Sequence, residues 1–468
     1  MLVLGLLLPV VLGLIACWLI IPGAAILMRL ALAYSLGFGF LTLGMLLLNV
    51  FGLRFSLVNT TLLVLAVAGI LLLLRRKRSW LGLAAAVKVN PFGRIKEFVS
   101  SLSAFEKILL GLLAFFLLSH LIITVYWPVL WSDSLTLYDL RAKFLFEEQS
   151  FPGAIATFHE RLTNIGRSSY VFSHAPMTSL VHTWLYLCGW SSPKVFYPLL
   201  FISLTVLFYH FLRDYVPRYH ALLFTLILAT SPYMYAYAAS SYPHFTVAFY
   251  FSVGTLCLYR WILTQKRGFL LLAGILLGLS SWVRQLSGIF FLGYVIILLY
   301  IGVSRRRFFA PLLFCALYFS IAPLWTIYSQ QILHLAGAGE HGTPGILQIS
   351  AFLPMIGRFF DLLRWREVFA LFWKYIAVNF RVIYYVLILT TVLYINRVWK
   401  HRFLLLIILS NLGLFLTGIY IEVLTHGRLT SASSAERITI MFLPIIWYFI
   451  ALITSERKFL NGATRTAK

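Results

Sequence analysis

Long apolar runs of about twenty residues recur along the whole chain, and they constrain its fold more than any other feature. A helix of that length matches the thickness of the hydrocarbon core of a bilayer. Hydrophobic residues make up 61% of the 468 positions and charged residues 11%, whereas soluble domains are about half apolar and a quarter charged. A soluble fold of this size could not bury so much apolar surface. The sequence therefore predicts an all-α polytopic membrane protein.

The apolar runs predict about thirteen membrane spans. The first run is not interpreted as a cleaved signal peptide, because it lacks a basic start and a small-residue cleavage site. The predicted spans are 2–20, 25–49, 57–74, 105–127, 193–212, 219–238, 245–263, 269–284, 286–303, 308–328, 375–395, 403–422 and 438–453.

Basic residues determine the predicted orientation. Lys and Arg number 38 against 14 Asp and Glu, which gives a net charge of +24. In a soluble protein this excess would suggest nucleic acid, but here the basic residues cluster in short loops between apolar runs. We therefore expect no nucleic-acid partner. Placing clusters such as Arg305–Arg307 in the cytoplasm puts the N-terminus outside. Most acidic residues, including Asp133, then fall outside, although only Lys and Arg set the orientation.

Two long stretches do not span the membrane and are predicted to form large external loops, at residues 128–192 and 329–374. The amphipathic pieces Leu135–Glu148 and Arg358–Phe372 within them are predicted to lie flat on the outer membrane surface. The segment Pro176–Leu187 is too short and too polar for a span, so it is predicted to be a juxtamembrane helix.

The chain is predicted to divide into two regions. Residues 1–100 are expected to form an N-terminal module of three transmembrane helices, which ends in the basic linker Arg75–Lys96. Residues 101–468 are expected to form the transmembrane catalytic region that carries both external loops.

The most distinctive local feature is Trp131-Ser132-Asp133-Ser134, just beyond the fourth predicted span. An acid at the boundary between water and lipid, beneath aromatic side chains, is suited to act as a general base. Alternatively, Asp133 caps the helix predicted from Leu135, because Asp is favoured at helix N-termini. The local sequence supports both interpretations equally.

Three candidate substrate-binding residues lie in the first external loop. Arg141 and Lys143 could bind an anionic head group or a lipid phosphate, although membrane-surface anchoring is the commoner role of a single basic residue. His174 could donate a hydrogen bond to a phosphate or polarise a leaving group. The alternative for His174 is that of a hydrogen-bonded structural histidine.

Three further candidates lie at the predicted outer ends of later spans. His244 belongs to a short external turn. Arg284 interrupts an apolar stretch, where an arginine is costly, so it should face a polar cavity or a partner. A tight external turn is the alternative for Arg284. Arg437 precedes the last span, at the level where a phosphate-bearing lipid could pair with it.

No motif for a bound nucleotide or metal is present in the sequence. There is no Walker loop, dinucleotide fingerprint, His-Glu-x-x-His or nucleophile elbow. The four cysteines stand singly in or beside apolar runs, without the spacing of metal ligands. No cofactor is expected with certainty, and the sequence does not exclude a divalent metal.

The order of these motifs resembles the GT-C superfamily of polytopic glycosyltransferases, over roughly residues 105–455. Family members carry an acid at the start of the first large external loop, where Asp133 stands. Many then carry Lys-Pro-Pro or Tyr-Pro-Pro before a juxtamembrane helix, and segment 173–176 occupies that place, with His174 at the Lys position. The chain is most similar to the branch that uses dolichyl- or polyprenyl-phosphate sugars, such as protein mannosyltransferases and the aminoarabinose transferase of lipid A.

The chain departs from the family pattern at one acid. Many members have an acid directly before a proline, where this chain has Tyr242-Pro243, which argues against a two-carboxylate or metal-assisted mechanism. The stretch that ends at Arg284 and the one that begins at Glu436-Arg437 resemble two further family elements.

The resemblance implies an inverting transfer of a sugar from a polyprenyl phosphate to a hydroxyl of a lipid, glycan or protein acceptor. The reaction would take place among membrane lipids, on the extracytoplasmic side of the plasma (inner) membrane. Asp133 would act as the general base, and Arg284, Arg437 and His174 would stabilise the departing phosphate. The alternatives are a glycan polymerase or ligase with a diphosphate donor, a lipid or sugar transporter, and a non-catalytic scaffold. Transporters usually show internal repeats and polar residues at mid-membrane, which this sequence does not.

Overall fold

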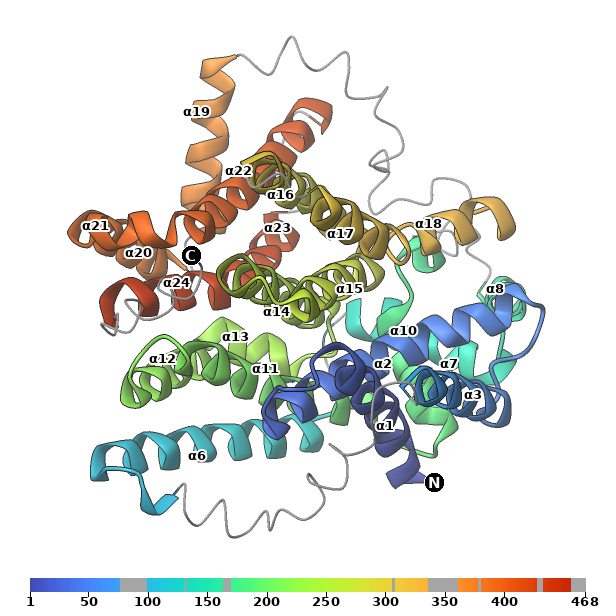
Figure 1. The fold of residues 1–468 in the computed structure, drawn as a ribbon. Helices are drawn as coiled ribbons and strands as arrows, with labels where there is room; N and C mark the ends of the chain where they lie inside the picture. Colours follow the sequence, from blue (N-terminus) through green and yellow to red (C-terminus); the bar gives the residue numbers. More distant parts are fainter. Residues whose placement is uncertain are drawn as a thin grey trace.

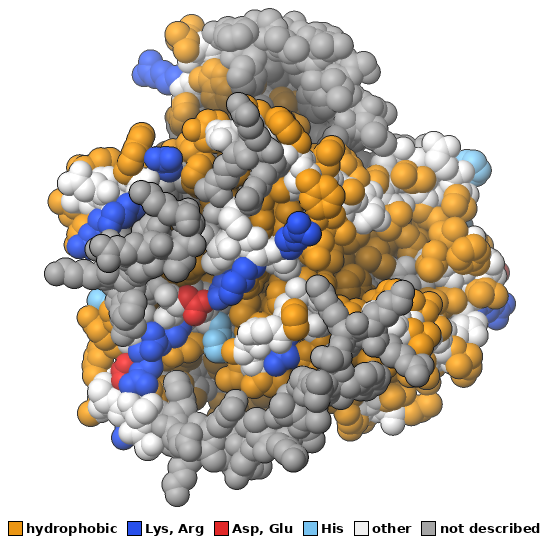
Figure 2. Space-filling view, in the orientation of Figure 1, with side chains coloured by type: hydrophobic (Ala, Val, Ile, Leu, Met, Phe, Trp, Pro, Cys, Tyr) orange, Lys and Arg blue, Asp and Glu red, His pale blue; other side chains and the backbone are white. Residues whose placement is uncertain are grey.

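The computed structural model describes residues 1–75, 99–129, 131, 133–162, 170–304, 308–335, 361–377, 380–426 and 432–455. Within these ranges the chain is helical and contains no strand, which confirms the predicted all-α class. Hydrophobic side chains cover much of the face shown in Figure 2, and few acidic side chains reach it. The protein is therefore a multi-pass membrane protein whose surface suits a lipid environment.

Nine helices in the described ranges are long and apolar enough to cross a bilayer. The spans of α11, α16, α22 and α24 include short helical turns before the main helix. The nine are α1 (Leu2–Ile20), α2 (Ile26–Val50), α3 (Leu57–Arg75), α6 (Ala104–Tyr126), α11 (Phe196–Arg213), α14 (Pro243–Thr264), α16 (Phe291–Ser304), α22 (Arg402–His426) and α24 (Leu443–Ser455).

Two of the predicted spans are bent helix pairs, which raise the number of candidate spans to eleven if each pair is one span. The helices α12 (Arg218–Thr230) and α13 (Pro232–Ala239) meet at 60°. The helix α17 (Phe309–Phe319) and the segment Leu324–Ile332 meet at 42°. A proline begins the second member of the first pair and directly precedes that of the second. Proline lacks the N–H that would continue the preceding helix, which accounts for both breaks.

Two further predicted spans, 269–284 and 375–395, correspond to shorter helices. These are α15 (Arg267–Val283), of 17 residues, and α20 (Arg381–Leu393), of 13 residues. The described ranges thus contain nine to eleven candidate spans, and the total of about thirteen stays a prediction.

Several predictions fall outside the described ranges. They concern most of the basic linker, the cluster Arg305–Arg307 and residues 336–360 of the second loop. The described part of that loop contains most of the turn Tyr328–Ile332, which follows α18 (Leu324–Ile327), and then α19 (Leu362–Leu371). The first loop contains the turn η1 (Ser134–Asp139), α7 (Leu140–Glu148), α8 (Phe151–Arg161) and α10 (Met177–Leu187).

The predicted juxtamembrane helix is α10, and it is packed inside the protein. Most of its side chains are buried, and it contacts α7 and α2. Helix α7 likewise buries Arg141, Phe144 and Leu145 against its neighbours. The loop helices thus form a layer beside the N-terminal helices (Figure 1).

The first two helices pack against each other at backbone distance. A Cβ added at Gly37 would lie 1.8 Å from the Pro9 carbonyl oxygen, and one at Gly13 would lie 1.9 Å from that of Ala33. Only glycine permits this approach, and small residues at such contacts are a common means of helix association in membranes.

The N-terminal helices also bond to later parts of the chain. The Tyr250 hydroxyl donates to the Ser35 carbonyl, and Trp184 Nε1 donates to the Gly5 carbonyl. At the end of α2, Asn49 Oδ1 accepts from Phe151 N at 3.0 Å and from the Tyr328 hydroxyl at 2.7 Å. The division predicted at residue 100 stays a prediction, and α1–α3 lie against the rest of the bundle (Figure 1).

Helix α6 runs from one end of the bundle to the other. It begins at a capping box between Ser103 and Glu106, and Glu106 forms an ion pair with Arg218 at 2.8 Å. It ends at Tyr126, and the C-cap residue Trp127 follows shortly before Asp133. Helix α14 begins and α15 ends near Asp133, and we call this end of the bundle the Asp133 end.

Candidate functional site

Asp133 forms an ion pair with a residue that is far away in sequence. Its Oδ2 lies 3.2 Å from Nη1 of Arg437, 304 residues later. Asp133 directly precedes η1, and its side chain makes no capping hydrogen bond there. The alternative interpretation of Asp133 as a helix cap is therefore wrong. The Asp133 side chain is 42% exposed, so the carboxylate is open to a substrate.

Aromatic rings surround this ion pair. The Arg437 guanidinium lies over the Tyr242 ring, 5.2 Å from its centroid. The Trp131 ring meets Tyr242 edge-on at 5.8 Å and stacks on Tyr237 at 6.4 Å. We call Trp131, Tyr237 and Tyr242 the aromatic wall. Sequence reasoning did not assign these rings a role, although Trp131 and Tyr242 belong to the motifs that it selected.

Arg284 is buried where α15 ends. Its backbone is extended, and its carbonyl accepts hydrogen bonds from the Ser287 N–H and hydroxyl, which turn the chain into the next helix. Its side chain is 6% exposed and donates from Nη1 to His244 Nε2. Arg284 thus lies at a tight turn between two helices, which was the alternative interpretation, and its buried side chain has a histidine as its partner.

The hydrogen bond from Arg284 defines how His244 is protonated. A guanidinium group has donors only, so Nε2 of His244 must accept. The neutral ring then carries its proton on Nδ1, which is buried and has no hydrogen-bond partner in the described part of the chain. His244 therefore presents an unused donor.

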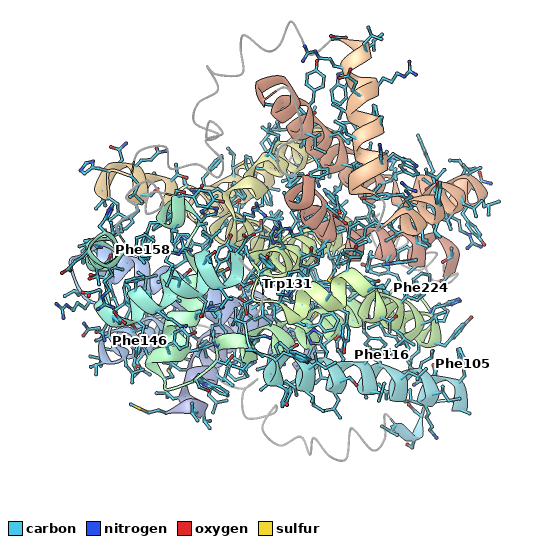
Figure 3. The ribbon with its side chains drawn as sticks, turned by 180° about the vertical axis from the view of Figure 1, so that it is seen from behind. Phe105, Phe116, Trp131, Phe146, Phe158 and Phe224 are labelled. Carbon is cyan, nitrogen blue, oxygen red and sulfur yellow. The ribbon has the colours of Figure 1, made fainter. Side chains whose placement is uncertain are left out.

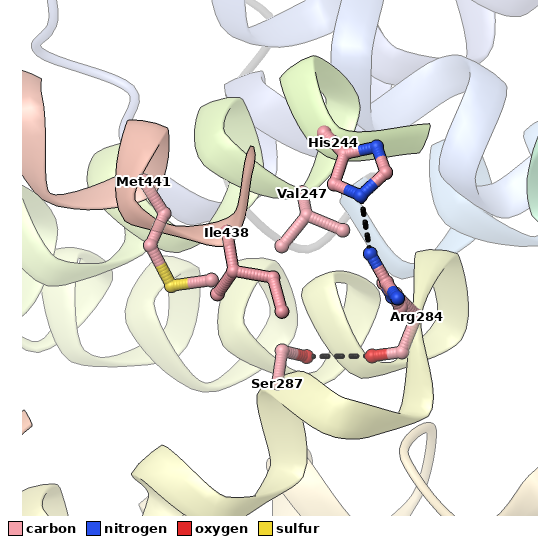
Figure 4. Close-up of a pocket in the computed structure, with 6 residues that line it drawn as sticks. All are labelled: His244, Val247, Arg284, Ser287, Ile438 and Met441. Atoms are coloured by element: carbon pink, nitrogen blue, oxygen red, sulfur yellow. Dashed lines mark hydrogen bonds between the residues drawn. The ribbon is translucent and has the colours of Figure 1, made fainter. Parts of the chain in front are cut away.

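A small cavity lies beside this pair (Figure 4). Its volume is about 10 Å³, which is close to the space that one water needs. Ile438 and Met441 line it from the side of α23 (Ala432–Ile438) and the turn that follows. The His244 ring meets the Tyr242 ring edge-on at 5.5 Å, and Arg437 lies over Tyr242, so the two arginine sites are neighbours. We call Asp133, Tyr242, His244, Arg284 and Arg437 the Asp133 cluster.

The structure places Arg141 elsewhere, in the protein interior. It has no exposed surface, and burial lowers its pKa to about 10. Its guanidinium donates to the Ser179 hydroxyl at 2.8 Å and to the carbonyls of His174 and Ala175. This position corrects the expectation of an anchor at the membrane surface and leaves no exposed donor for a head group. Arg141 instead holds the segment that leads into α10.

His174 and Lys143 belong to the same region as Arg141. His174 is 4% exposed, and its Nδ1 lies 2.7 Å from the Tyr170 carbonyl oxygen. Lys143 is exposed and forms an ion pair with Asp139 at 3.3 Å. The structure thus groups Arg141, Lys143 and His174 around α7 and α10, and groups His244, Arg284 and Arg437 with Asp133.

Asp139 is a buried acid that sequence reasoning did not select. The Tyr186 hydroxyl donates to it at 2.6 Å, and His182 Nδ1 lies 3.3 Å from its carboxylate. Burial raises the pKa of Asp139, but His182, Tyr186 and Lys143 lower it more, to about 2. The available signal was the spacing of four residues between 139 and 143, and again between 182 and 186, which places each pair on one helix face.

The substitution Asp139→Asn is expected to destabilise the fold by on the order of 2 kcal/mol near neutral pH. The pKa of Asp139 in the folded state is below the ordinary value of 3.8, so its stabilisation is present above that value. It is lost as the pH falls toward about 2. Melting curves from pH 7 down to pH 3 should show a constant difference between the two proteins at first, which shrinks once the pH falls below 3.8. The control is Glu147→Gln, whose half-exposed ion pair with Arg161 is expected to contribute little. A constant difference in melting temperature across this range would contradict the prediction.

Potential metal ligands do not gather in the described ranges. No group of three or more His, Cys, Asp or Glu side chains with suitable geometry occurs there. Asp133, the exposed acid of the cluster, is paired with an arginine.

Searches of the chain against protein-family models, curated proteins and solved structures found no match.

Proposed function

We propose that this protein is a membrane glycosyltransferase that moves a sugar from a polyprenyl phosphate to an acceptor hydroxyl, with inversion at the anomeric carbon. The supporting observation is that Asp133 and Arg437 form an ion pair beside the buried pair of Arg284 and His244. The reaction needs a base for the hydroxyl proton and fixed positive charge for the departing phosphate. The Asp133 cluster supplies both within one group of residues.

The proposed step has a simple balance of bonds. The Asp133 carboxylate takes the proton of the acceptor hydroxyl, whose oxygen attacks the anomeric carbon of the donor sugar. The bond from that carbon to the phosphate oxygen breaks, and its electron pair stays on the phosphate. Arg437 and Arg284 bind the phosphate as its charge grows, because guanidinium groups match phosphate oxygens in geometry and charge.

His244 has the role of a donor in this proposal. Its Nε2 is occupied by Arg284, and its Nδ1 proton has no partner among the described residues. A buried donor without a partner is costly, and a phosphate or sugar oxygen would satisfy it. We therefore assign His244 to substrate binding and Asp133 to proton removal.

We place this site on the extracytoplasmic side of the plasma (inner) membrane. Basic residues favour the cytoplasmic side of membrane proteins. Arg213 and Arg218 lie between α11 and α12, and Lys266 and Arg267 between α14 and α15. Both connections are at the end of the bundle opposite Asp133, which supports this orientation.

The test is a transfer assay with the purified full-length chain. Polyprenyl-monophosphate sugars and polyprenyl-diphosphate sugars are supplied separately, with membrane lipids, glycans and peptides as acceptors. We expect a glycosylated product from a monophosphate donor. Product from diphosphate donors alone would favour a polymerase or ligase. Movement of the lipid-linked sugar across proteoliposomes without a product would favour a transporter and would refute the proposal.

A further inference from the structure

A second cavity, of about 350 Å³, opens next to the aromatic wall. It lies between the end of α6, the end of α13 and the start of α11, and Trp131 lines it. In Figure 3, Phe105, Phe116 and Trp131 follow one another along α6 and the segment after it, so this cavity is at the Asp133 end. None of the residues that line this cavity belongs to the Asp133 cluster.

A buried lysine supplies positive charge to this cavity. Lys194 is 4% exposed, and its Nζ donates to the carbonyls of Trp127 at 2.7 Å and Pro128 at 3.2 Å. These bonds cap the end of α6, which accounts for part of the position of the lysine. An ammonium group has three donors, so one remains. No acid lies within ion-pair distance of Lys194 among the described residues.

A second donor lines the same cavity. Ser241 is 2% exposed, and its hydroxyl has no hydrogen-bond partner in the part of the chain that the structure describes. Buried hydroxyl groups nearly always have a partner, and a buried charge normally has a counter-ion. Both requirements are met at once by an anionic group with oxygen acceptors that lies between Lys194 and Ser241.

The remaining lining indicates an amphiphile. Ile123, Trp127 and Ala239 contribute apolar surface, and the first two are also well exposed on α6. Only 22% of the apolar window of α6 is buried in the protein, so this helix faces lipid along most of its length. A ligand can therefore enter sideways from the bilayer, with its apolar part along α6 and its head group at Lys194.

We propose that this cavity binds the acceptor, and that the acceptor is a membrane lipid with an anionic head group. This inference rests on the proposed function, in which the phosphate of the donor occupies the Arg284 and Arg437 side. Trp131 lines the cavity and contacts Tyr242, over which Arg437 pairs with Asp133. A lipid seated at Lys194 would thus present its head-group hydroxyl next to the general base.

The experiment measures binding of dioctanoyl phosphatidylglycerol to the purified full-length protein in detergent, by calorimetry. Dioctanoyl phosphatidylcholine and inorganic phosphate are titrated separately. We expect phosphatidylglycerol to bind best, and Lys194→Gln to bind it roughly tenfold more weakly, because a charge-assisted bond is lost. The control is Lys107→Gln, which removes an exposed lysine at the opposite end of α6 and should bind the lipid like the parent.

Because Lys194 also caps α6, a second variant tests the cavity without removing the cap. Ala239→Phe fills the cavity and keeps Lys194 in place, so it should abolish lipid binding while the melting temperature stays close to that of the parent. Equal binding by the parent and Ala239→Phe would overturn the inference. Binding of inorganic phosphate as tight as that of the lipid would overturn the lipid assignment.

Two outcomes separate this inference from the proposed function. If Ala239→Phe loses lipid binding but still transfers sugar to that lipid, the acceptor assignment is wrong and the glycosyltransferase proposal stands. If the parent binds the lipid at Lys194 but transfers no sugar to any acceptor, the proposed function is wrong, and the acceptor assignment falls with it. Weaker binding of polyprenyl phosphate to Lys194→Gln would reassign the cavity to the donor and overturn the inference.

Discussion

The substitution Asp133→Asn is expected to leave a folded protein that binds the donor but transfers sugar on the order of a hundredfold to ten-thousandfold more slowly. Asn is nearly isosteric with Asp but cannot take the proton of the acceptor. The half-exposed ion pair with Arg437 contributes little to stability, so the melting temperature should change by only a few degrees. The measurement is turnover with a polyprenyl-phosphate sugar, beside a melting curve of the same preparation.

The matched control for Asp133→Asn is Glu147→Gln, which removes a carboxylate from another half-exposed ion pair, with Arg161 on α8. Its turnover should equal that of the parent. Near-parental turnover of the Asp133 variant would exclude Asp133 as the base. Equal losses in both variants would indicate a general effect of carboxylate removal on the fold.

The substitution Arg284→Gln is expected to lower kcat by about a hundredfold to a thousandfold, the usual cost of removing one fixed donor to a developing negative charge. KM for the donor should change less if the arginine acts mainly on the departing phosphate. Because Arg284 is buried against His244, the fold must be checked in parallel. Arg284→Lys keeps the charge and should recover part of the loss.

Arg260→Gln provides the control for the arginine variant. Arg260 is partly buried near the opposite end of α14 and pairs with Asp214. Its removal should leave kcat unchanged even if it costs some stability. Parental kinetics in Arg284→Gln would remove Arg284 from the site, and equal loss in both arginine variants would point to stability as the cause.

Hydropathy predicted where helices occur, because burial in lipid depends on local composition alone. Each predicted span coincides with a helix or a helix pair. The breaks at Ser231 and Ser320 were not predicted, since a window of about twenty residues averages over a bend. The prolines that follow were the available signal.

The sequence selected the charged residues and the histidine of the Asp133 cluster, but neither Tyr242 nor the pairing between them. Residue type and position at a span end selected Asp133, Arg284 and Arg437 one at a time. The ion pair between positions 133 and 437 depends on how the whole bundle folds, which no local pattern contains. The amphipathic pattern around Arg141 was ambiguous in a different way, because a helix that faces a loop and one that faces a membrane surface have the same periodicity. The burial of Arg141 shows that its helix packs against the other helices of the first external loop and not on the membrane surface.

The contact between the first two helices has a consequence for the order of events during synthesis. The Ser35 carbonyl receives its hydrogen bond from Tyr250, 215 residues later in the chain. At a synthesis rate of about 5–20 residues per second, that partner appears roughly ten to forty seconds after Ser35. Helices α1 and α2 contact each other more than any other element, and the close approach at Gly13 and Gly37 lets them associate before the later helices are made. The hairpin that they form then provides a preformed surface in the bilayer, against which α10, α11 and α15 pack later.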